Sequence, residues 1–247
     1  MTLSSTVIYD DPAVYKQYEE LVFSQQGLAL HPEWTLMREM IGDVLGQNIV
    51  DLGCGFGWFC KWASDHGATL VHGIDNSSKI LEKAQVVNSG PGITYERADL
   101  DEVVLAKEKF DLAFSSLTFH YVKDFDLLVE KIHGSLKSGG RFVFSIQHPI
   151  WTAPDGVSWQ ETADGQHYWP LSTYCQEGPR ISKWIANGVT VYHRTVHTHF
   201  AVLRKHGFEV LDVAEWMMQP GELPLGHPDH GKELHRPFWL IMSARKK

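Results

Sequence analysis

Residues 48–63 read NIVDLGCGFGWFCKWA and place glycines at positions 53, 55 and 57, directly after a short apolar run. The apolar run, residues 48–52, predicts a β-strand, and the stretch near residues 58–66 predicts an α-helix. A strand that leads through glycines into a helix presents backbone amides to a ligand at the positive end of that helix. These residues therefore predict a ligand-binding turn in an α/β protein.

Strand and helix patterns continue to alternate after this turn. Strands and helices that alternate at this spacing are joined by right-handed crossovers, so we expect a Rossmann-like, mostly parallel sheet of seven strands with helices on both faces. Residues 12–44 are expected to form an N-terminal helical cap, and residues 148–192 an aromatic-rich insertion after the fifth strand. The other predicted strands are residues 69–74, 93–96, 110–115, 141–146, 208–213 and 238–243, and the other predicted helices are residues 77–88, 124–136 and 195–206.

The composition narrows the classes of partner. A formal charge of −8 argues against nucleic acid, because proteins that bind it present basic surfaces. The cysteines at 54, 60 and 175 have no CxxC spacing, and the histidines have no ligand spacing, so we expect free thiols and no metal. The first residues lack the features of a signal peptide, and no apolar run approaches the roughly 18 residues of a membrane span. We therefore expect a cytoplasmic protein with neither a membrane nor a nucleic acid as partner.

Two classes of cofactor fit a glycine turn of this kind. Dinucleotide oxidoreductases use G-x-G-x-x-G, in which the last glycine lets the helix pack closely beside a pyrophosphate. Trp58 occupies the position of that last glycine, so the dinucleotide interpretation fits poorly. The second class binds S-adenosylmethionine (SAM), which carries no phosphate.

The motifs resemble those of class I SAM-dependent methyltransferases. DLGCGFG at 51–57 is similar to their first motif, and HGIDNS at 72–77 places an acid at the end of the second strand. Residues 110–122 resemble the fourth motif, and LKSGGRF at 136–142 resembles the "LKPGG" turn with serine in place of proline. The resemblance covers residues 48–146 and is closest to the small-molecule type of the methyltransferase domain 11 group. It implies SAM as cofactor and S-adenosylhomocysteine (SAH) as product.

The resemblance also assigns roles to residues around the methionine part of the cofactor. The backbone at Gly53 and Gly55 is expected to lie against it, with a backbone contact from Ser115. Asp51 is expected to contact its amine, although it would also suit a helix cap. Tyr18 in the N-terminal cap is expected to reach its carboxylate.

The nucleoside part would meet the ends of the second and third strands. Asp75 is expected to accept both ribose hydroxyls through charged hydrogen bonds worth about 1.5–3 kcal/mol each. Asp99 would meet the adenine amino group and the Leu100 amide a ring nitrogen. Asn76 is expected either to flank the adenine or to cap the following helix.

His120 and His148 follow the fourth and fifth strands and would therefore face the same crevice. Aligning the reactants contributes on the order of 7–11 kcal/mol to such a reaction, so a base is needed only where the acceptor must lose a proton early. A histidine suits that task because its unperturbed pKa is near 6.5. We expect His148 to be the better candidate, although a histidine in either position is more often a packing or hydrogen-bonded residue than a catalyst.

The insertion is unusually aromatic. Its rings would form a small core of their own, or line an acceptor pocket by stacking on a planar substrate or enclosing an amine. Arg194, at its end, is expected to form a salt bridge or to bind an acidic group. The aromatic residues concerned are Trp151, Trp159, Tyr168, Trp169, Tyr174, Trp184 and Tyr192.

The sequence thus predicts one methyltransferase domain over residues 1–247. Its expected parts are a helical cap (1–46), a cofactor-binding half (47–147), a lid insertion (148–194) and a C-terminal helix with the last two strands (195–247). The expected activity is methyl transfer to an O, N or C atom of a small-molecule acceptor, aromatic or heterocyclic, by a monomer or homodimer. The alternatives are a SAM-binding regulatory or scaffolding protein, a nicotinamide oxidoreductase, and a methyltransferase acting on protein or RNA.

Overall fold

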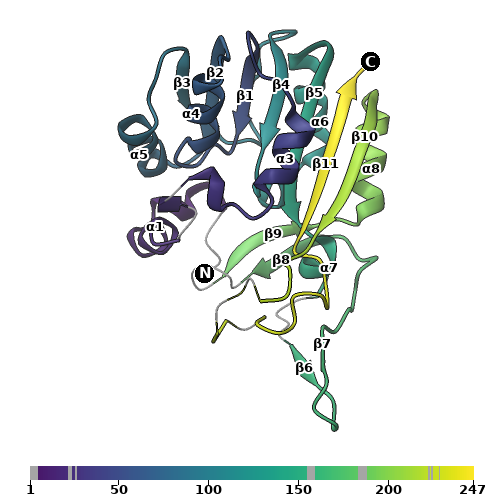
Figure 1. The fold of residues 1–247 in the computed structure, drawn as a ribbon. Coiled ribbons are helices and arrows are strands. Elements are labelled where there is room, and N and C mark those ends of the chain that lie inside the picture. The colour runs from purple at the N-terminus through teal and green to yellow at the C-terminus, as the bar shows by residue number, and fades with distance from the viewer. Residues whose placement is uncertain are drawn as a thin grey trace.

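A seven-stranded sheet forms the centre of the computed structural model (Figure 1). The structure describes residues 5–21, 24–25, 27–154, 159–182, 188–221, 223, 225–227 and 229–247, so Trp184 lies outside the described residues. The strand order is β10-β11-β5-β4-β1-β2-β3. The strands are β1 (Asn48–Leu52), β2 (Leu70–Asp75), β3 (Ile93–Arg97), β4 (Phe110–Ser115), β5 (Leu136–Gln147), β10 (Phe208–Trp216) and β11 (Trp239–Lys246).

The first five strands pair in parallel, and β11 runs antiparallel to both of its neighbours, β5 and β10. The predicted seven-stranded, mostly parallel sheet is therefore confirmed. The strand order reverses at β1, which has β2 on one side and β4 on the other. In open sheets of this kind the crevice for a ligand forms beyond the carboxyl ends of the strands at such a reversal.

Helices cover both faces of the sheet, and several begin at residues suited to capping. Ser77, Asp124 and Thr195 each accept a hydrogen bond from a backbone amide in the first turn of the following helix. The helices are α1 (Pro12–Glu19), α3 (Trp34–Ile41), α4 (Trp58–Asp65), α5 (Ser78–Val87), α6 (Phe125–Ser135), α7 (Pro149–Thr152) and α8 (Val196–Lys205), with short 3₁₀ turns η1 (Ser5–Asp10), η2 (Leu28–Leu30) and η3 (Phe119–Tyr121).

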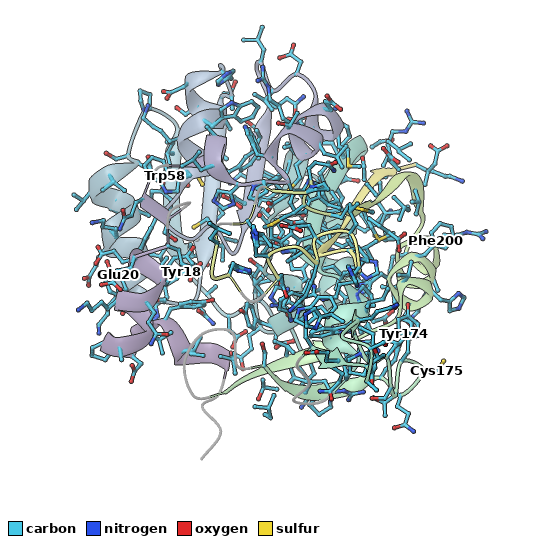
Figure 2. The ribbon with its side chains drawn as sticks, turned by 60° about the horizontal axis from the view of Figure 1, so that its bottom comes forward. Tyr18, Glu20, Trp58, Tyr174, Cys175 and Phe200 are labelled. Atoms are coloured by element: carbon cyan, nitrogen blue, oxygen red, sulfur yellow. The ribbon has the colours of Figure 1, made fainter. Side chains whose placement is uncertain are left out.

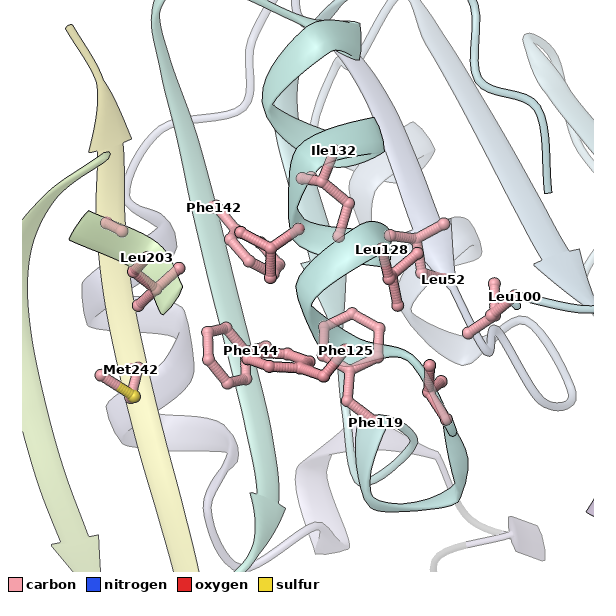
Figure 3. Close-up of a cluster of buried hydrophobic side chains, with 14 of the residues drawn as sticks. Leu52, Leu100, Phe119, Phe125, Leu128, Ile132, Phe142, Phe144, Leu203 and Met242 are labelled. Atoms are coloured by element: carbon pink, nitrogen blue, oxygen red, sulfur yellow. The ribbon is translucent and has the colours of Figure 1, made fainter. Parts of the chain in front are cut away.

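Two apolar cores lie on opposite faces of the sheet, as the alternation of side chains along a strand requires. Phe142 and Phe144 of β5 pack with α6 and α8 on one face, whereas Val143 packs with α3 and α4 on the other. Figure 3 shows the first core, in which phenylalanine side chains from η3, α6 and β5 meet. Both faces of the sheet are thus covered by packed helices.

Two segments differ in detail from the prediction. The LKSGG segment is part of β5 and not a turn before it, but Leu136 pairs with Phe110 and Arg141 with Leu112, so the residues between them bulge out of the register. The insertion contains more regular structure than the sequence predicts. Its strands are too short to show a recognisable alternation of apolar and polar residues. It contains α7 and the hairpins β6 (Gln160–Glu161)/β7 (His167–Tyr168) and β8 (Gly178–Ser182)/β9 (Val189–His193).

The N-terminal helix α1, the insertion and the connection between β10 and β11 gather at one end of the sheet, whereas α3 lies on its face (Figure 1). This is the end at which the parallel strands β1 to β5 terminate. Within the described ranges, no helix has the length and apolar character needed to cross a membrane.

Candidate active site

A cavity of about 740 Å³ lies at the carboxyl ends of the parallel strands. This volume is within the range of about 300–1,000 Å³ that small-molecule sites occupy. Its lining comes from four parts of the chain: residues 8–33, the glycine turn and the loops after β2 to β4, the insertion, and residues 218–239. The cavity therefore lies where the three peripheral segments meet the sheet.

The glycine turn adopts a backbone that favours glycine. Gly53 has φ of 79° and Gly55 of 53°, both in the left-handed region. A Cβ atom on Gly53 would lie 2.2 Å from the Thr118 hydroxyl oxygen, and one on Gly55 would lie 2.8 Å from the Tyr18 hydroxyl oxygen. The glycines are thus required by the conformation and by close packing of neighbouring side chains, and both line the cavity.

Trp58 links this turn to the N-terminal segment. Its indole nitrogen donates to the backbone carbonyl of Ser24 at 3.0 Å, and its ring lies against Gly27, where a Cβ atom would come within 3.1 Å. Figure 2 shows Trp58 and Tyr18 on the same side of the molecule, away from Tyr174 of the insertion. Trp58, which stands where the dinucleotide pattern has its last glycine, therefore anchors the N-terminal segment beside the site.

Asp51 belongs to β1, and its side chain lines the cavity although the residue is only 2% exposed. The Cys60 thiol donates to its carboxylate at 3.3 Å. Burial raises the pKa of Asp51 to about 7, and the nearby Asp75 carboxylate adds to this effect. A buried carboxylate with so raised a pKa is suited to pair with a cation that enters the cavity.

Asp75 is oriented by the backbone around it. Its two carboxylate oxygens accept from the amides of Gly55 at 3.1 Å and Ser77 at 3.0 Å, while burial raises its pKa. The carboxylate thereby connects the glycine turn to the start of α5. Asn76, Asp99 and Leu100 line the same cavity.

Tyr18 reaches the cavity from α1, at the opposite side of the glycine turn from the sheet. Its ring packs against Tyr9, with centroids 5.0 Å apart, and against Phe56, with centroids 5.2 Å apart. Burial raises the pKa of Tyr18, so its hydroxyl remains protonated and can donate a hydrogen bond at neutral pH.

The side chain of Ser115 links two strands of the sheet. It is fully buried and donates to the Leu52 carbonyl at 2.7 Å, which joins β4 to β1, and it is not among the lining residues. Its neighbour Ser116 lines the cavity instead. The expected contact is from the backbone of Ser115, which the position of its side chain does not test, so that contact stays a prediction.

The two predicted histidines have different surroundings. His120 lines the cavity, and its Nδ1 accepts from the Gln147 amide at 3.4 Å. Burial, with a contribution from Arg194, lowers the pKa of His120 to about 3. The ring is therefore neutral, and because Nδ1 is an acceptor its proton is on Nε2. Such a ring donates a hydrogen bond but is a weak base.

His148 does not fit the role of a base. It is 1% exposed and absent from the cavity lining. Its Nε2 is 2.9 Å from a Glu215 carboxylate oxygen, and its Nδ1 accepts from the Ile150 amide at 3.1 Å. Both ring nitrogens are thus occupied, and the side chain caps α7. We correct the prediction accordingly, because the chain turns into α7 directly after β5.

Three tryptophans of the insertion line the cavity: Trp151, Trp159 and Trp169. Trp151 and Trp169 also pack on each other with centroids 5.8 Å apart, as a small aromatic core requires. That the rings contact an acceptor stays a prediction. Arg194 forms no salt bridge within the described residues. Its Nη2 donates to the carbonyls of Val122 at 2.7 Å and Lys123 at 2.8 Å.

Some charged residues of the cavity have no motif and were missed by the sequence reasoning. Glu33 is 1% exposed; its Oε1 accepts from Ser116 at 3.1 Å, and its Oε2 has no hydrogen-bond partner among the described residues. Arg236 and Asp229, from the connection between β10 and β11, are also buried and line the cavity. The only sequence signal for this connection is a run of histidines, prolines and charges between two strands.

Comparisons with known proteins agree with this geometry. A family model described as "Methyltransferase domain" matches residues 50–144. A solved SAM-dependent methyltransferase from Mesorhizobium loti is 46% identical, with a TM-score of 0.82, over 89% of this chain and 100% of that chain. A Listeria monocytogenes structure assigned to the same class is 35% identical, with a TM-score of 0.78, over 87% of this chain and 98% of that chain. An uncharacterized protein of Haemophilus influenzae is 30% identical over 97% of this chain and 96% of its own length.

Proposed function

This chain belongs to the class I SAM-dependent methyltransferases, and from that premise we propose that it transfers a methyl group to an O, N or C atom of a small-molecule acceptor. The observation that carries the proposal is that the strand-end carboxylates and the tryptophans of the insertion line one cavity. A cavity of about 740 Å³, bounded by three peripheral segments, favours a small acceptor over a protein or nucleic acid.

The residues present fit SAM as cofactor. When bound, SAM supplies a methyl group on a positively charged sulfonium. We propose that Asp75 accepts from the ribose hydroxyls and that Asp99 and Leu100 contact the adenine. Each of these residues lines the cavity, and Asp75 is already oriented by two backbone amides.

The methionine end would be held by groups on both sides of the glycine turn. We propose that Asp51 and the free Oε2 of Glu33 face its amine, and that the Tyr18 hydroxyl donates to its carboxylate. No residue that the structure describes donates to this Glu33 oxygen, and a buried oxygen without a donor costs about 1–3 kcal/mol, so a ligand N–H would offset that cost. Asn76 would flank the adenine.

His120 is proposed to orient the acceptor and not to deprotonate it. Its neutral ring carries the proton on Nε2, and its pKa of about 3 is far below the value that suits a general base at neutral pH. A donor at this place would fix an acceptor oxygen or nitrogen beside the reacting centre. Alignment of this kind contributes on the order of 7–11 kcal/mol without proton transfer.

We further propose that the four predicted parts of the chain act as one unit. Residues 148–194 would close over the acceptor, and residues 1–46 over the cofactor, so that water is excluded from the reacting centre. The anchoring of Trp58 on Ser24 supports closure by the N-terminal part, because it ties this part to the glycine turn.

Labelled SAM tests the proposal. The protein is incubated with methyl-labelled SAM and a small-molecule extract from which proteins and nucleic acids have been removed. We expect label in a small product and stoichiometric SAH in the same reaction. Binding of SAH without any labelled product would favour the alternative of a SAM-binding regulatory protein. A whole extract, which still contains protein and RNA, is assayed in parallel, and label found only in its protein or RNA would contradict a small acceptor.

A further inference from the structure

The aromatic rings at the tryptophan-rich end of the cavity already enclose a cation of the protein itself, the guanidinium of Arg236. The guanidinium carbon of Arg236 lies 3.8 Å from the ring centroid of Trp151, 4.3 Å from that of Trp169 and 4.8 Å from that of Phe238. Trp159 is farther away, at 5.4 Å. These faces therefore bind Arg236 by cation–π contact, and a substrate amine is not needed to explain them.

Arg236 is buried without a full set of hydrogen-bond partners. It is 3% exposed, and its Nη2 pairs with an Asp229 oxygen at 3.2 Å. Its Nε and Nη1 are buried and have no acceptor among the described residues. These two nitrogens carry N–H donors that a carboxylate could satisfy. Burial lowers the pKa of Arg236 to about 10, so the side chain is nevertheless charged at neutral pH.

The surroundings of Arg236 hold it in place. Trp169 donates to the Ile150 carbonyl at 3.0 Å, and Trp159 donates to Asp229. The guanidinium is thus oriented by rings from the insertion and by a carboxylate from its own loop. A cation held in this way, away from water, interacts more strongly with an incoming anion than a cation on the surface does.

The lining of the cavity contains one lysine or arginine among the residues that the structure describes, and this is Arg236. The aspartates proposed to bind the cofactor, Asp51, Asp75 and Asp99, lie at the ends of β1 to β3, and Glu33, proposed to bind its amine, comes from the N-terminal segment. Phe238 and Trp239 connect Arg236 to β11, and Trp239 pairs with Gln147, whose amide donates to His120. Arg236 therefore lies on the same side of the cavity as the residue proposed to orient the acceptor.

Resting on the function proposed above, we propose that the acceptor carries a carboxylate that Arg236 binds. An amine is disfavoured because the aromatic faces already hold a cation. A phosphate dianion is disfavoured because Arg236 is a single cation already shared with Asp229, in a cavity whose described lining includes six acidic residues. A carboxylate carries one negative charge on a planar group, which matches the single planar guanidinium of Arg236 held against the tryptophan rings.

Matched probes of one shape test this proposal. Benzoate, benzamide and benzamidinium have nearly the same size but charges of −1, 0 and +1. Each is titrated into the SAH-bound protein while tryptophan fluorescence is recorded, because the rings of Trp151 and Trp169 lie against the guanidinium that a carboxylate would contact. We expect benzoate to bind at least about tenfold more tightly than benzamide, and benzamidinium to bind most weakly.

Variants at both partners of the ion pair distinguish recognition from a structural role. Arg236→Gln is expected to reduce the preference for benzoate over benzamide to below about threefold, and Arg236→Lys to retain part of it. Asp229→Asn is expected to tighten benzoate, because it removes the competing carboxylate. Arg194→Gln is the matched control: Arg194 is a half-buried arginine that does not line the cavity, so the preference is expected to stay at the parent value.

The outcomes separate this proposal from the proposed function. Equal or weaker binding of benzoate relative to benzamide would overturn the carboxylate assignment, as would no benzoate binding at about 10 mM. An unchanged preference in Arg236→Gln would also overturn it. SAH affinity is measured on the same samples: if SAH binds while benzoate fails, the methyltransferase proposal stands, whereas loss of SAH binding in the parent contradicts that proposal itself.

Discussion

The two ends of the cavity are built in different ways. At the cofactor end, Asp51, Asp75 and Asp99 come from the ends of neighbouring strands or directly after them, so strand register brings them together. At the other end, Trp151 and Arg236 come from segments far apart in the chain and are joined by ring contacts. The first arrangement follows from backbone geometry, whereas the second depends on tertiary packing of irregular segments.

The largest expected effect is on cofactor affinity, which should depend on the cofactor end of the cavity and not on the end that holds Arg236. Asp75→Asn should weaken SAH binding by about 100-fold or more, because two charged hydrogen bonds of about 1.5–3 kcal/mol each are lost. Arg236→Gln should leave SAH affinity within about threefold, because it acts at the other end. Calorimetric titration with SAH measures both.

Asp111→Asn is the control for Asp75. This carboxylate at the start of β4 accepts from the Asn48 amide at 2.9 Å and from Lys137 at 2.8 Å, outside the cavity. Its loss should cost stability but leave SAH affinity unchanged. Equal losses of affinity in the Asp75 and Asp111 variants would contradict a specific contact from Asp75.

The next effect concerns stability of the glycine turn. Gly53→Ala should lower the free energy of unfolding by about 2–5 kcal/mol, because it combines left-handed strain of about 1–2 kcal/mol with a collision against Thr118. Gly139→Ala has a similar φ of 77° but no atom within 4 Å, so it should cost only the strain. Urea unfolding of both variants measures the difference, and equal costs would show that packing against Thr118 adds nothing.

Asp51 gives the cofactor end a dependence on pH. Its folded pKa of about 7 exceeds the ordinary value of 3.8, so the folded protein holds this proton up to neutral pH. The stability that this group contributes therefore falls as the pH rises from about 4 to about 7. Pairing with a cofactor cation requires the ionised form, so SAH affinity should fall by up to about tenfold per pH unit below pH 7.

Asp51→Asn is the variant that tests this assignment. Its SAH affinity should be weaker than that of the parent above pH 7 and nearly independent of pH, because the amide does not titrate. Titrations at several pH values measure the slope. A slope that persists in the variant would assign the titration to another group.

The smallest expected effect is that of His148. Once an acceptor is found by labelling, His148→Gln should change turnover by less than about threefold but lower the free energy of unfolding by about 1 kcal/mol, since the cap at the Ile150 amide is weakened. His120→Gln should lower turnover more, because it faces the cavity. Thermal unfolding and initial rates separate the two, and a large loss of turnover in His148→Gln alone would restore its predicted role.

The cofactor end was largely predictable from the sequence because its residues are tied to regular elements. Each acid stands in or next to a strand whose position follows from local patterns, and parallel strands bring their carboxyl ends to one edge. His148 shows the limit of this reasoning. It stands at the correct end of a strand, but its ring pairs with Glu215, and that orientation depends on a neighbour remote in sequence.

The sequence by itself determined the glycine turn, the mostly parallel sheet and the set of acids along its edge, because periodicity and backbone conformation act over a few residues. Only the tertiary structure decided that Arg236 lies against the tryptophan rings of the insertion, that Glu33 reaches Ser116, and that Arg194 donates to the Val122 carbonyl. These contacts join irregular segments through side-chain packing, for which no short-range pattern exists.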